Sequence, residues 1–581
     1  MVAEPVRCVA LVARCGGIWL LARLAGRLQP LTLAVLSKIS TPSKNWKPET
    51  ASLPLWLALL TLVGAFLRFG YVYGTGDQDE LIPSVLHLLD GALFTQDWLV
   101  QTVTSGVNVR TYFLWLTALP SLALPVWLTS AVLWGGVMVA LAYGVYGLAW
   151  EVTRSRLGAA LAVPVALAVA VKWTLGANAL VSNAHVPESV AWALIVPAVT
   201  VFLQRRWVRA GLLLGVAAWL HLLAAAQVAL VLGVVGLAQA VAAVELDGRQ
   251  LRADFVALLA FGGVFLLAAL PALGPVVLDQ LTPSGGLAEA APPFYIHAQF
   301  RNPFHHLFSS FEVAHHLRFW PLVALGLASG VGLDRRGALR HGRALAVGGS
   351  LVAALCALAV VFVEVVPVTL VAKLQFFKLT VLVNLLCSVL IAAALVHLLP
   401  APLRRTGRWL LEQRRAGLAL ALGFAFVVGV LAVQGVGRPG ALLVPVRHLA
   451  SPLGEAEQWA RAETPPDALF AVPPSVSSFR SFAHRAVVAN YAGFVFADRD
   501  MQVWFRRLMD LAPISPPETG IGVKPVLDAA YARHEPEAWR RLQSGYGIDY
   551  ILMPQEAAAL PFRVAFENEG WLVYRLPEAT S

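Results

Sequence analysis

The stretch Gly74-Thr75-Gly76-Asp77-Gln78-Asp79-Glu80 places three carboxylates within four residues, directly after the apolar segment Leu53 to Gly70. As a helix that segment is long enough to cross a bilayer. Carboxylates are costly beside lipid, so acids at the point where a span meets water predict either a functional site or a solvated helix end. The position of this stretch in the rest of the chain favours the functional interpretation.

The composition is that of a membrane protein. Of the 581 residues, 58% are hydrophobic and 13% are charged, and the mean hydropathy is +0.69. A soluble protein carries about 25% charged residues. The net charge of +10 does not indicate nucleic acid, because Lys and Arg lie in short clusters between apolar runs, as cytoplasmic loops do. The sequence predicts a multi-pass protein of the inner (cell) membrane that contacts membrane lipids and binds no nucleic acid.

About eleven spans are predicted from apolar runs, most of them about 20 residues long. They fall at 53–70, 126–150, 157–175, 187–203, 208–221, 224–243, 253–275, 317–333, 344–363, 374–399 and 416–434. With this count every strongly basic loop lies on the cytoplasmic side. The count requires 110–124 to dip into the outer leaflet without crossing it. Residues 1–36 form either an amphipathic surface helix or a further span.

Three parts are expected along the chain. Residues 1–50 form an N-terminal amphipathic or cytoplasmic segment, and residues 51–436 form a mainly α-helical, polytopic transmembrane domain. Its long outer loops are 71–109 and 276–316. From about residue 440 the composition becomes that of a soluble protein, with short strand-like and helical patterns. Residues 440–581 are therefore predicted to be a small α/β domain on the outer face.

Histidines gather on the predicted outer side. Five of the thirteen histidines fall in the loop 276–316, and His221 lies at a turn facing the same side. The outer loops are poor in Lys and Arg. This concentration makes the loop 276–316 a candidate partner of the acids in the opening stretch.

A carboxylate at the outer face suits one kind of chemistry. Nucleotide-activated donors are absent there, so a sugar would arrive on a polyprenyl phosphate. Asp77 is the preferred general base for an acceptor hydroxyl, with Asp79 or Glu80 as its catalytic partner. Asp77 and Asp79 are also candidate ligands of a divalent cation, Mg²⁺ or Mn²⁺. The candidates for binding the donor phosphate or the acceptor are His221, His297, Arg301, Lys373, Gln375, Lys378 and Arg480.

The order of these parts resembles a known superfamily. A first span followed by an outward loop that opens with Asp77-Gln78-Asp79-Glu80 is similar to the GT-C glycosyltransferases. The resemblance implies a polytopic enzyme that uses polyprenyl-phosphate sugars, with surface helices after the acidic motif. A closer likeness is to uncharacterised bacterial membrane proteins of this layout, at Gly76 to Pro83, at Leu88 to Trp98, and at Thr464 to Pro474 with Phe479-Arg480. These likenesses fix neither the sugar nor the acceptor.

Two other functions stay open. A transporter or flippase of lipid or sugar would need polar or helix-breaking residues within the spans and paired repeats. The spans are almost wholly apolar, with Pro164, Pro197 and Asn384 as the main exceptions, and no second half repeats the first. A non-catalytic envelope-assembly protein is the other alternative. For each single histidine or lysine, a polar cap at a helix end is the competing interpretation.

Overall fold

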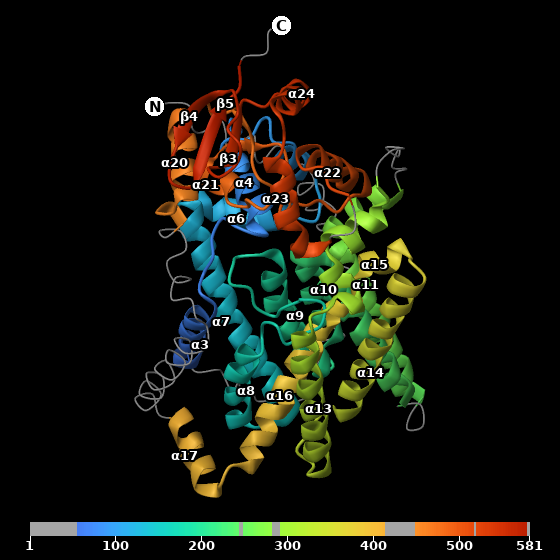
Figure 1. Ribbon diagram of the computed structural model, residues 1–581. Helices are drawn as coiled ribbons and strands as arrows, with labels where there is room; N and C mark the ends of the chain where they lie inside the picture. The colour runs from blue at the N-terminus through green and yellow to red at the C-terminus, as the bar shows by residue number, and fades with distance from the viewer. Residues whose placement is uncertain (1–54, 243–247, 282–290, 413–447, 516–518, 578–581) are drawn as a thin grey trace, which may run out of the picture. The chain divides into compact units, whose positions relative to one another are not determined.

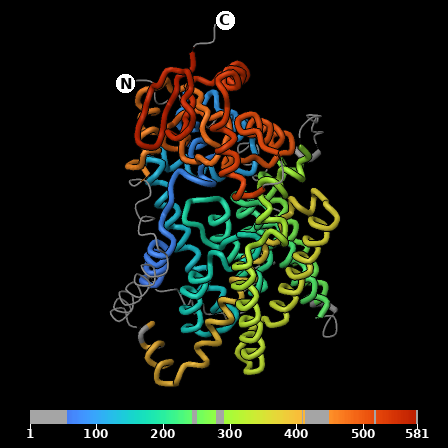
Figure 2. Tube along the Cα trace, viewed as in Figure 1, coloured from blue at the N-terminus to red at the C-terminus, as the bar shows by residue number. Residues whose placement is uncertain are grey.

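The computed structural model describes residues 55–242, 248–281, 291–412, 448–515 and 519–577. The predicted segment 1–50 and the predicted span 416–434 lie outside these residues. Residues 52–581 belong to one compact unit, so the membrane helices and the C-terminal segment can be described together. Figures 1 and 2 show this unit from the first described helix, in blue, to the C-terminal strands, in red.

The first part of the chain is helical and contains long and short helices. They are α3 (Leu55–Phe69), α4 (Gln78–Leu89), α5 (Trp98–Thr104), α6 (Thr111–Ser121), α7 (Val126–Thr153), α8 (Arg156–Ala168), α9 (Pro187–Leu203) and α10 (Trp207–Ala242). The 11 residues of α6 rise about 16 Å, too little to cross a bilayer. This agrees with the expected dip over 110–124.

The middle of the chain alternates long helices with short turns. These elements are α11 (Gly248–Leu281), the π-helix η1 (Tyr295–Arg301), α12 (Pro303–His306), η2 (Phe308–Ser310), α13 (Val313–Arg335), α14 (Gly342–Ala359), the π-helix η3 (Val360–Val365), α15 (Thr369–Leu374), η4 (Phe376–Leu379), α16 (Thr380–Leu398) and α17 (Ala401–Glu412). Six helical stretches of the described residues are long and apolar enough to cross a membrane. The chain is therefore a multi-pass membrane protein.

The predicted number of eleven spans is not confirmed. The helices α3, α8 and α9 cover three predicted spans with only 15, 13 and 17 residues. The last predicted span lies outside the described residues. The number of crossings therefore stays a prediction, whereas the multi-pass character does not depend on it.

The long element α10 turns back on itself at His221, whose backbone is extended (φ −149°, ψ 89°). Gly211 lies against Phe261 of α11, and Gly236 lies against Leu258, less than one turn away on the same helix. Both ends of α10 thus reach the same level of α11, and its two halves run antiparallel, like the predicted spans 208–221 and 224–243. A Cβ on Gly211 would lie 2.5 Å from the Phe261 carbonyl oxygen, so this contact requires glycine.

The C-terminal segment folds into an α/β domain. Its elements are α20 (Pro452–Glu463), β1 (Leu469–Ala471), α21 (Phe479–Ala483), β2 (Ala486–Val487), α22 (Asp498–Leu511), η6 (Gly520–Val523), α23 (Lys524–Ala532), α24 (Pro536–Tyr546), β3 (Tyr550–Pro554), β4 (Arg563–Glu567) and β5 (Trp571–Arg575). The strand order is β2-β1-β3-β5-β4. Strand β1 is parallel to β2 and β3, and β5 is antiparallel to β3 and β4. The predicted fold class, mainly α with a small C-terminal α/β domain, is confirmed.

The two ends of the membrane helices differ in charge. One end carries Arg154 and Arg340 around the buried Glu151, and Arg205 pairs there with Asp254. The other end, called the site end from here on, carries α4 to α6, η1 with α12, α15 with η4, and the C-terminal domain. Figure 1 shows the C-terminal domain beside α4 and α6 and far from α17. That the site end faces outward stays a prediction.

Candidate functional site

The three acids of the opening stretch have different surroundings. Asp77 immediately precedes α4, and its side chain is exposed and forms no cap hydrogen bond. Asp79 and Glu80 lie in the first turn of α4 and are buried, with 0% and 4% exposure. Adjacent helical residues point about 100° apart, so Asp79 faces the C-terminal domain and Glu80 faces the start of α6. Of the three, Asp77 is the acid that a substrate can reach.

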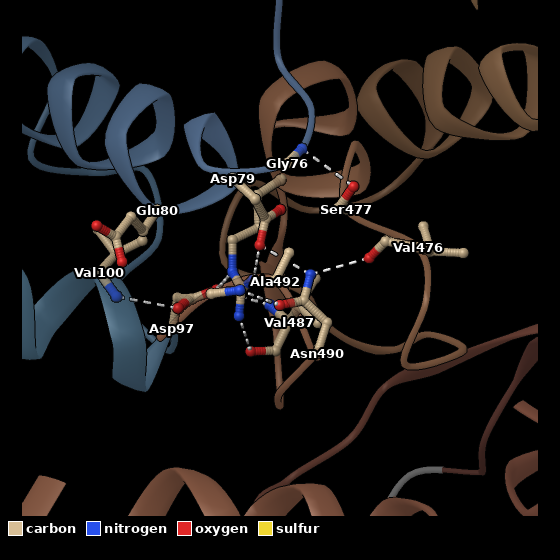
Figure 3. A network of polar contacts seen from close by, with 12 residues as sticks. Gly76, Asp79, Glu80, Asp97, Val100, Val476, Ser477, Val487, Asn490 and Ala492 are labelled. Carbon is tan, nitrogen blue, oxygen red and sulfur yellow. Dashed lines mark hydrogen bonds and ion pairs between the residues drawn. The ribbon is translucent and has the colours of Figure 1, made fainter. Parts of the chain in front are cut away.

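Asp79 belongs to a buried network of four residues, Arg480, Asp79, Asp97 and Asn490, called the Arg480 clamp here. Arg480 donates from Nη1 to Asp79 Oδ2 at 2.8 Å and from Nε to Asp97 Oδ2 at 2.6 Å. Asn490 donates to the same Asp79 oxygen at 2.8 Å. Figure 3 shows Asp79, Asp97 and Asn490 converging from the two sides of the junction. The clamp joins α4 and the start of α5 to the C-terminal domain.

The clamp has more acidic than basic groups, because one guanidinium is paired with two carboxylates. Burial raises the pKa of the Asp79 carboxyl to about 6, although Arg480 and Asn490 oppose this shift. Burial lowers the pKa of Arg480, but Asp97 and Asp79 outweigh it and the pKa is raised. Removing Arg480 would leave two buried carboxylates without a cation. Asp79 and Arg480, predicted as a catalytic and a substrate-binding residue, therefore have a structural contact with each other.

Glycines bring the opening stretch against the C-terminal domain. Gly74 has φ +76°, and a Cβ there would lie 2.8 Å from the Phe482 ring. The Gly76 amide donates to Ser477 Oγ at 3.2 Å, a contact drawn in Figure 3. Only glycine combines this backbone conformation with so close an approach. These contacts fix the position of Asp77.

Glu80 pairs with a cation that the sequence did not single out. Arg110, which precedes α6, lies 2.5 Å from Glu80 (Nε to Oε1), and its guanidinium lies 5.2 Å from the Phe496 ring centroid. Burial raises the pKa of Glu80, and Arg110 opposes this shift. The ion pair ties α4 to α6.

A second polar group, called the Glu188 cluster here, consists of Glu188, Lys378, His221 and His305. Pro187 opens α9 at its first position and places Glu188 in the first turn, where an acid is favoured. Lys378 Nζ lies 2.8 Å from Glu188 Oε2, and His221 Nε2 lies 3.8 Å from it. The side chains of Lys378, His221 and Glu188 keep 10%, 17% and 21% exposure. They therefore face space that water can enter.

Asp77 lies within electrostatic range of this cluster. Burial lowers the pKa of His305 to about 4 and Lys378 adds to the effect, whereas the Gly176 carbonyl, Glu188 and Asp77 oppose it. His305 Nδ1 lies 2.5 Å from the Gly176 carbonyl oxygen, which fixes the ring. The structure thus brings predicted residues from four distant segments together, namely Asp77, His221, Lys378 and the loop of His305.

The loop with His297 lies beside the same cluster. The His297 ring is 3% exposed and lies 4.5 Å from the His306 ring, and Gln375 Nε2 is 3.4 Å from His297 Nε2. Burial lowers the pKa of His297 to about 3, with Lys373 as the largest of the further causes. Both imidazoles are therefore neutral at neutral pH, which suits them to hydrogen bonding rather than to charge pairing.

Gln375 and Lys373 occupy the turn between α15 and η4. Gln375 has a left-handed backbone (φ 47°), a conformation that costs a non-glycine residue about 1 kcal/mol or more. Gln227 holds this turn by donating to the carbonyls of Leu374 and Gln375. Lys373 pairs with Asp498 of the C-terminal domain at 2.8 Å. Of the predicted cations, Lys373, Lys378 and Arg480 thus contact carboxylates of the protein itself.

Comparisons with known proteins find one family model and two similar solved structures. Residues 451–511 match the family model described as "Domain of unknown function (DUF6798)". The chain is similar to the structure of ArnT from Cupriavidus metallidurans bound to undecaprenyl phosphate, with 14% identity, a TM-score of 0.47, and coverage of 90% of this chain and 97% of that one. For ArnT in the apo state the TM-score is 0.43, with the same identity and coverage. No curated protein matches the sequence.

At this identity the likeness to ArnT concerns the fold alone, and the matched family model covers only part of the C-terminal domain.

The predicted metal site is not supported by the arrangement of its ligands. Among the described residues, no three His, Cys, Asp or Glu side chains are grouped so that they could hold a metal ion. One oxygen of Asp79 accepts from Arg480 and Asn490, and the other has no hydrogen-bond partner among the described residues. The divalent cation stays a prediction.

Residues of the site end that were not among the predicted site residues include Glu188, Arg110, Asn490 and Lys524. Glu188 carried a usable signal, since it is an acid at the first turn of a predicted span. Arg110 also precedes an apolar run. Asn490 and Lys524 lie in the soluble part, where polar residues are common, and only the fold brings them to the junction.

Proposed function

We propose that this protein is a GT-C-type membrane glycosyltransferase, which transfers a sugar from a polyprenyl-phosphate donor to an acceptor at the outer, periplasmic face of the inner membrane. The observation that carries the proposal is the state of Asp77. It is an exposed carboxylate without a cap hydrogen bond, held beside a polar cluster that water can enter, at the membrane end where the C-terminal domain lies. Undecaprenyl phosphate, the lipid in the ArnT structure, is of the class of carrier lipid that the proposed reaction would release.

Asp77 is proposed as the general base. The acceptor hydroxyl attacks the anomeric carbon, and its proton passes to the Asp77 carboxylate. The bond between the anomeric carbon and the phosphate oxygen breaks, and the polyprenyl phosphate leaves with the electron pair. Asp77 can take this role because, among the described residues, its carboxylate has no ion-pair partner, whereas Asp79 and Glu80 are paired with arginines.

The surrounding residues would bind rather than exchange protons. Lys378 and His221 place donors beside the reacting sugar, and Glu188 orients both of them. His297 and His305 are held neutral by burial, so each ring has a single N–H. His297 can donate one hydrogen bond to a sugar or phosphate oxygen, whereas His305 donates its Nδ1–H to the Gly176 carbonyl and can accept one from a sugar hydroxyl at Nε2. No step in this scheme requires the predicted divalent cation.

The placement of charge favours a reaction at one face over passage through the membrane. Glu188 lies in the first turn of α9, His221 lies at the turn of α10, and Lys378 lies in η4, which leads directly into α16. All three lie at the site end of their helices. A transporter would use such groups near the middle of its spans.

Transfer by the purified, full-length protein tests the proposal. The protein is reconstituted with a panel of undecaprenyl-phosphate hexoses and pentoses and an extract of envelope lipids and glycans, and release of undecaprenyl phosphate is followed by chromatography. We expect Asp77→Asn to reduce release about 10²- to 10⁴-fold, the usual range for loss of a general base.

Asp90→Asn is the matched control, since Asp90 is an exposed acid at the end of the same helix and lies outside the cluster. It should leave transfer unchanged. Wild-type activity of Asp77→Asn would overturn the assignment of the base. Movement of the lipid-linked sugar between leaflets without any new glycosidic bond would instead indicate a transporter.

A further inference from the structure

The cations at the site end differ in whether a carboxylate neutralises them. The paired cations, each with its partner, are Lys378 with Glu188, Lys373 with Asp498, Arg110 with Glu80, and Arg480 with Asp79 and Asp97. Arg301 and Lys524 form no ion pair among the described residues. Arg507 likewise forms no ion pair among the described residues, but it lies against Trp98 and Tyr546. Arg301 and Lys524 differ from it because they lie close to each other.

Both of them lie beside one aromatic ring. The Arg301 guanidinium carbon is 4.6 Å from the Tyr491 ring centroid, and the Lys524 ammonium nitrogen is 5.5 Å from the same centroid. Tyr491 Oη donates to the Arg301 carbonyl at 2.9 Å and so holds ring and loop together. Two like charges kept at one ring and partly buried are unfavourable unless an anion accompanies them.

The hydrogen bonds of Arg301 leave part of its guanidinium free. Nη2 donates to the Ala492 carbonyl and Nη1 donates to Asn302 Oδ1, both at 3.2 Å. Nε is buried and has no hydrogen-bond partner in the part of the chain that the structure describes. The head group is thus fixed in place while still able to donate to a ligand.

Lys524 is brought to this position by the fold of the C-terminal domain. It follows η6, and Gly520 at the start of η6 has φ +68° and approaches Pro303 so closely that a Cβ would lie 2.9 Å from its ring. Burial and Arg301 lower the pKa of Lys524, whereas Asp528, Asp77 and Asp79 oppose this shift. The proposed general base is thus within electrostatic range of the cation pair.

We propose that Arg301 and Lys524 jointly bind a phosphate group, and that the C-terminal domain thereby completes the site at the membrane. Two neighbouring cations, one of them a planar guanidinium, match the charge and oxygen geometry of a phosphate. The identity of this phosphate as that of the lipid donor rests on the proposed function. Binding itself does not require that a sugar be transferred.

A hydrocarbon chain could lie next to the phosphate. An apolar cavity of about 300 Å³ is lined by Tyr295, Phe300, Phe505 and Met509 among others, and the Phe300 ring is 6.1 Å from the Tyr491 ring. Apolar lining beside a cation pair suits a lipid phosphate better than a free one. The source of the phosphate is therefore expected to be a lipid.

Ligand binding to the full-length protein in detergent tests this proposal. Binding is measured by the rise in thermal unfolding temperature with undecaprenyl phosphate and, in a separate arm, with inorganic phosphate. We expect Lys524→Gln and Arg301→Gln each to weaken binding of undecaprenyl phosphate roughly tenfold or more, as loss of a charge-assisted hydrogen bond does. Lys524→Arg should retain most of the binding.

Arg540→Gln is the matched control, because it removes one positive charge from an exposed position of the same domain. It should bind like the wild type. If inorganic phosphate alone raises the unfolding temperature, and does so through Lys524, the site takes free phosphate. Lipid binding that Lys524→Gln and Arg301→Gln leave unchanged would overturn the proposal. Asp77→Asn should still bind the lipid, so failure of the transfer reaction is distinguished from failure of this site.

Discussion

The Arg480 clamp and the Glu188 cluster lie at the same end of the molecule, and both consist of acids held by cations. In the clamp every charged side chain is at most 1% exposed, and each makes short hydrogen bonds across the junction. In the Glu188 cluster the side chains of Lys378, His221 and Glu188 keep 10 to 21% exposure. One oxygen of Glu188 and one of Asp79 have no hydrogen-bond partner among the described residues, so exposure is what separates the two groups. A fully buried ion pair holds a structure together, whereas a partly open one can exchange a protein contact for a ligand.

The largest effect is expected from the clamp. Arg480→Ala would leave Asp79 and Asp97 buried without their cation, which should lower the free energy of unfolding by about 3–5 kcal/mol. Thermal unfolding of the purified protein, followed by tryptophan fluorescence, measures this loss. Arg540→Ala is the exposed control and should change little. An Arg480→Ala protein as stable as the wild type would show that the clamp is not structural.

Acid should destabilise the protein through its buried histidines. The pKa of His297 is lowered from 6.5 to about 3 and that of His305 to about 4. Between pH 6.5 and about 4 the unfolded chain binds protons that the folded chain does not, so the free energy of unfolding falls as the pH falls. For His297 the loss between pH 6.5 and pH 5 is about 2 kcal/mol.

The Asp79 carboxyl changes the free energy of unfolding with pH in the opposite direction. Its folded pKa of about 6 exceeds the ordinary value of 3.8, so between these values the folded state gains stability as the pH falls. The stability gained by protonating this single carboxyl offsets only part of the stability lost through the buried histidines. Unfolding temperatures measured from pH 7 to pH 5 should therefore decrease, and less steeply in His297→Gln. A flat profile in the wild type would contradict this prediction.

Substitutions in the Glu188 cluster should lower the free energy of unfolding less than substitutions in the clamp do. Glu188→Gln removes the partner of Lys378 in a place that water can enter, so we expect a loss of about 1–3 kcal/mol. Combining it with Lys378→Met removes both charges and should recover part of that loss. A double-mutant cycle on unfolding free energies gives the coupling. A coupling near zero would show that the pair is held by the surrounding helices alone.

The smallest effect on stability is expected at Asp77. The contrast between a structural acid and an acid available to a substrate is largest there. Since Asp77 is exposed and makes no cap hydrogen bond, Asp77→Asn should change the free energy of unfolding by no more than about 0.5 kcal/mol. The same substitution is expected to remove transfer activity. A loss of several kcal/mol would instead place Asp77 with the structural acids Asp79 and Glu80.

The sequence by itself determined the membrane class, the order of the main helices and the presence of a C-terminal α/β domain. These follow from the length of apolar runs and from periodicity, which are local properties of the chain. The turn at His221 and the terminal hairpin of β4 and β5 were also within reach of local patterns.

Only the tertiary structure decided what each acid of the opening stretch does. Asp77, Asp79 and Glu80 are almost equivalent in the sequence, yet their environments depend on Arg480 and Arg110. Arg480 lies 401 residues from Asp79 along the chain. Pairing over such a separation leaves no periodic signal, because it depends on how the C-terminal domain packs against α4. Sequence reasoning missed Lys524 for the same reason. Lys524 lies beside Tyr491 and Arg301 only once the C-terminal domain is packed against the membrane helices.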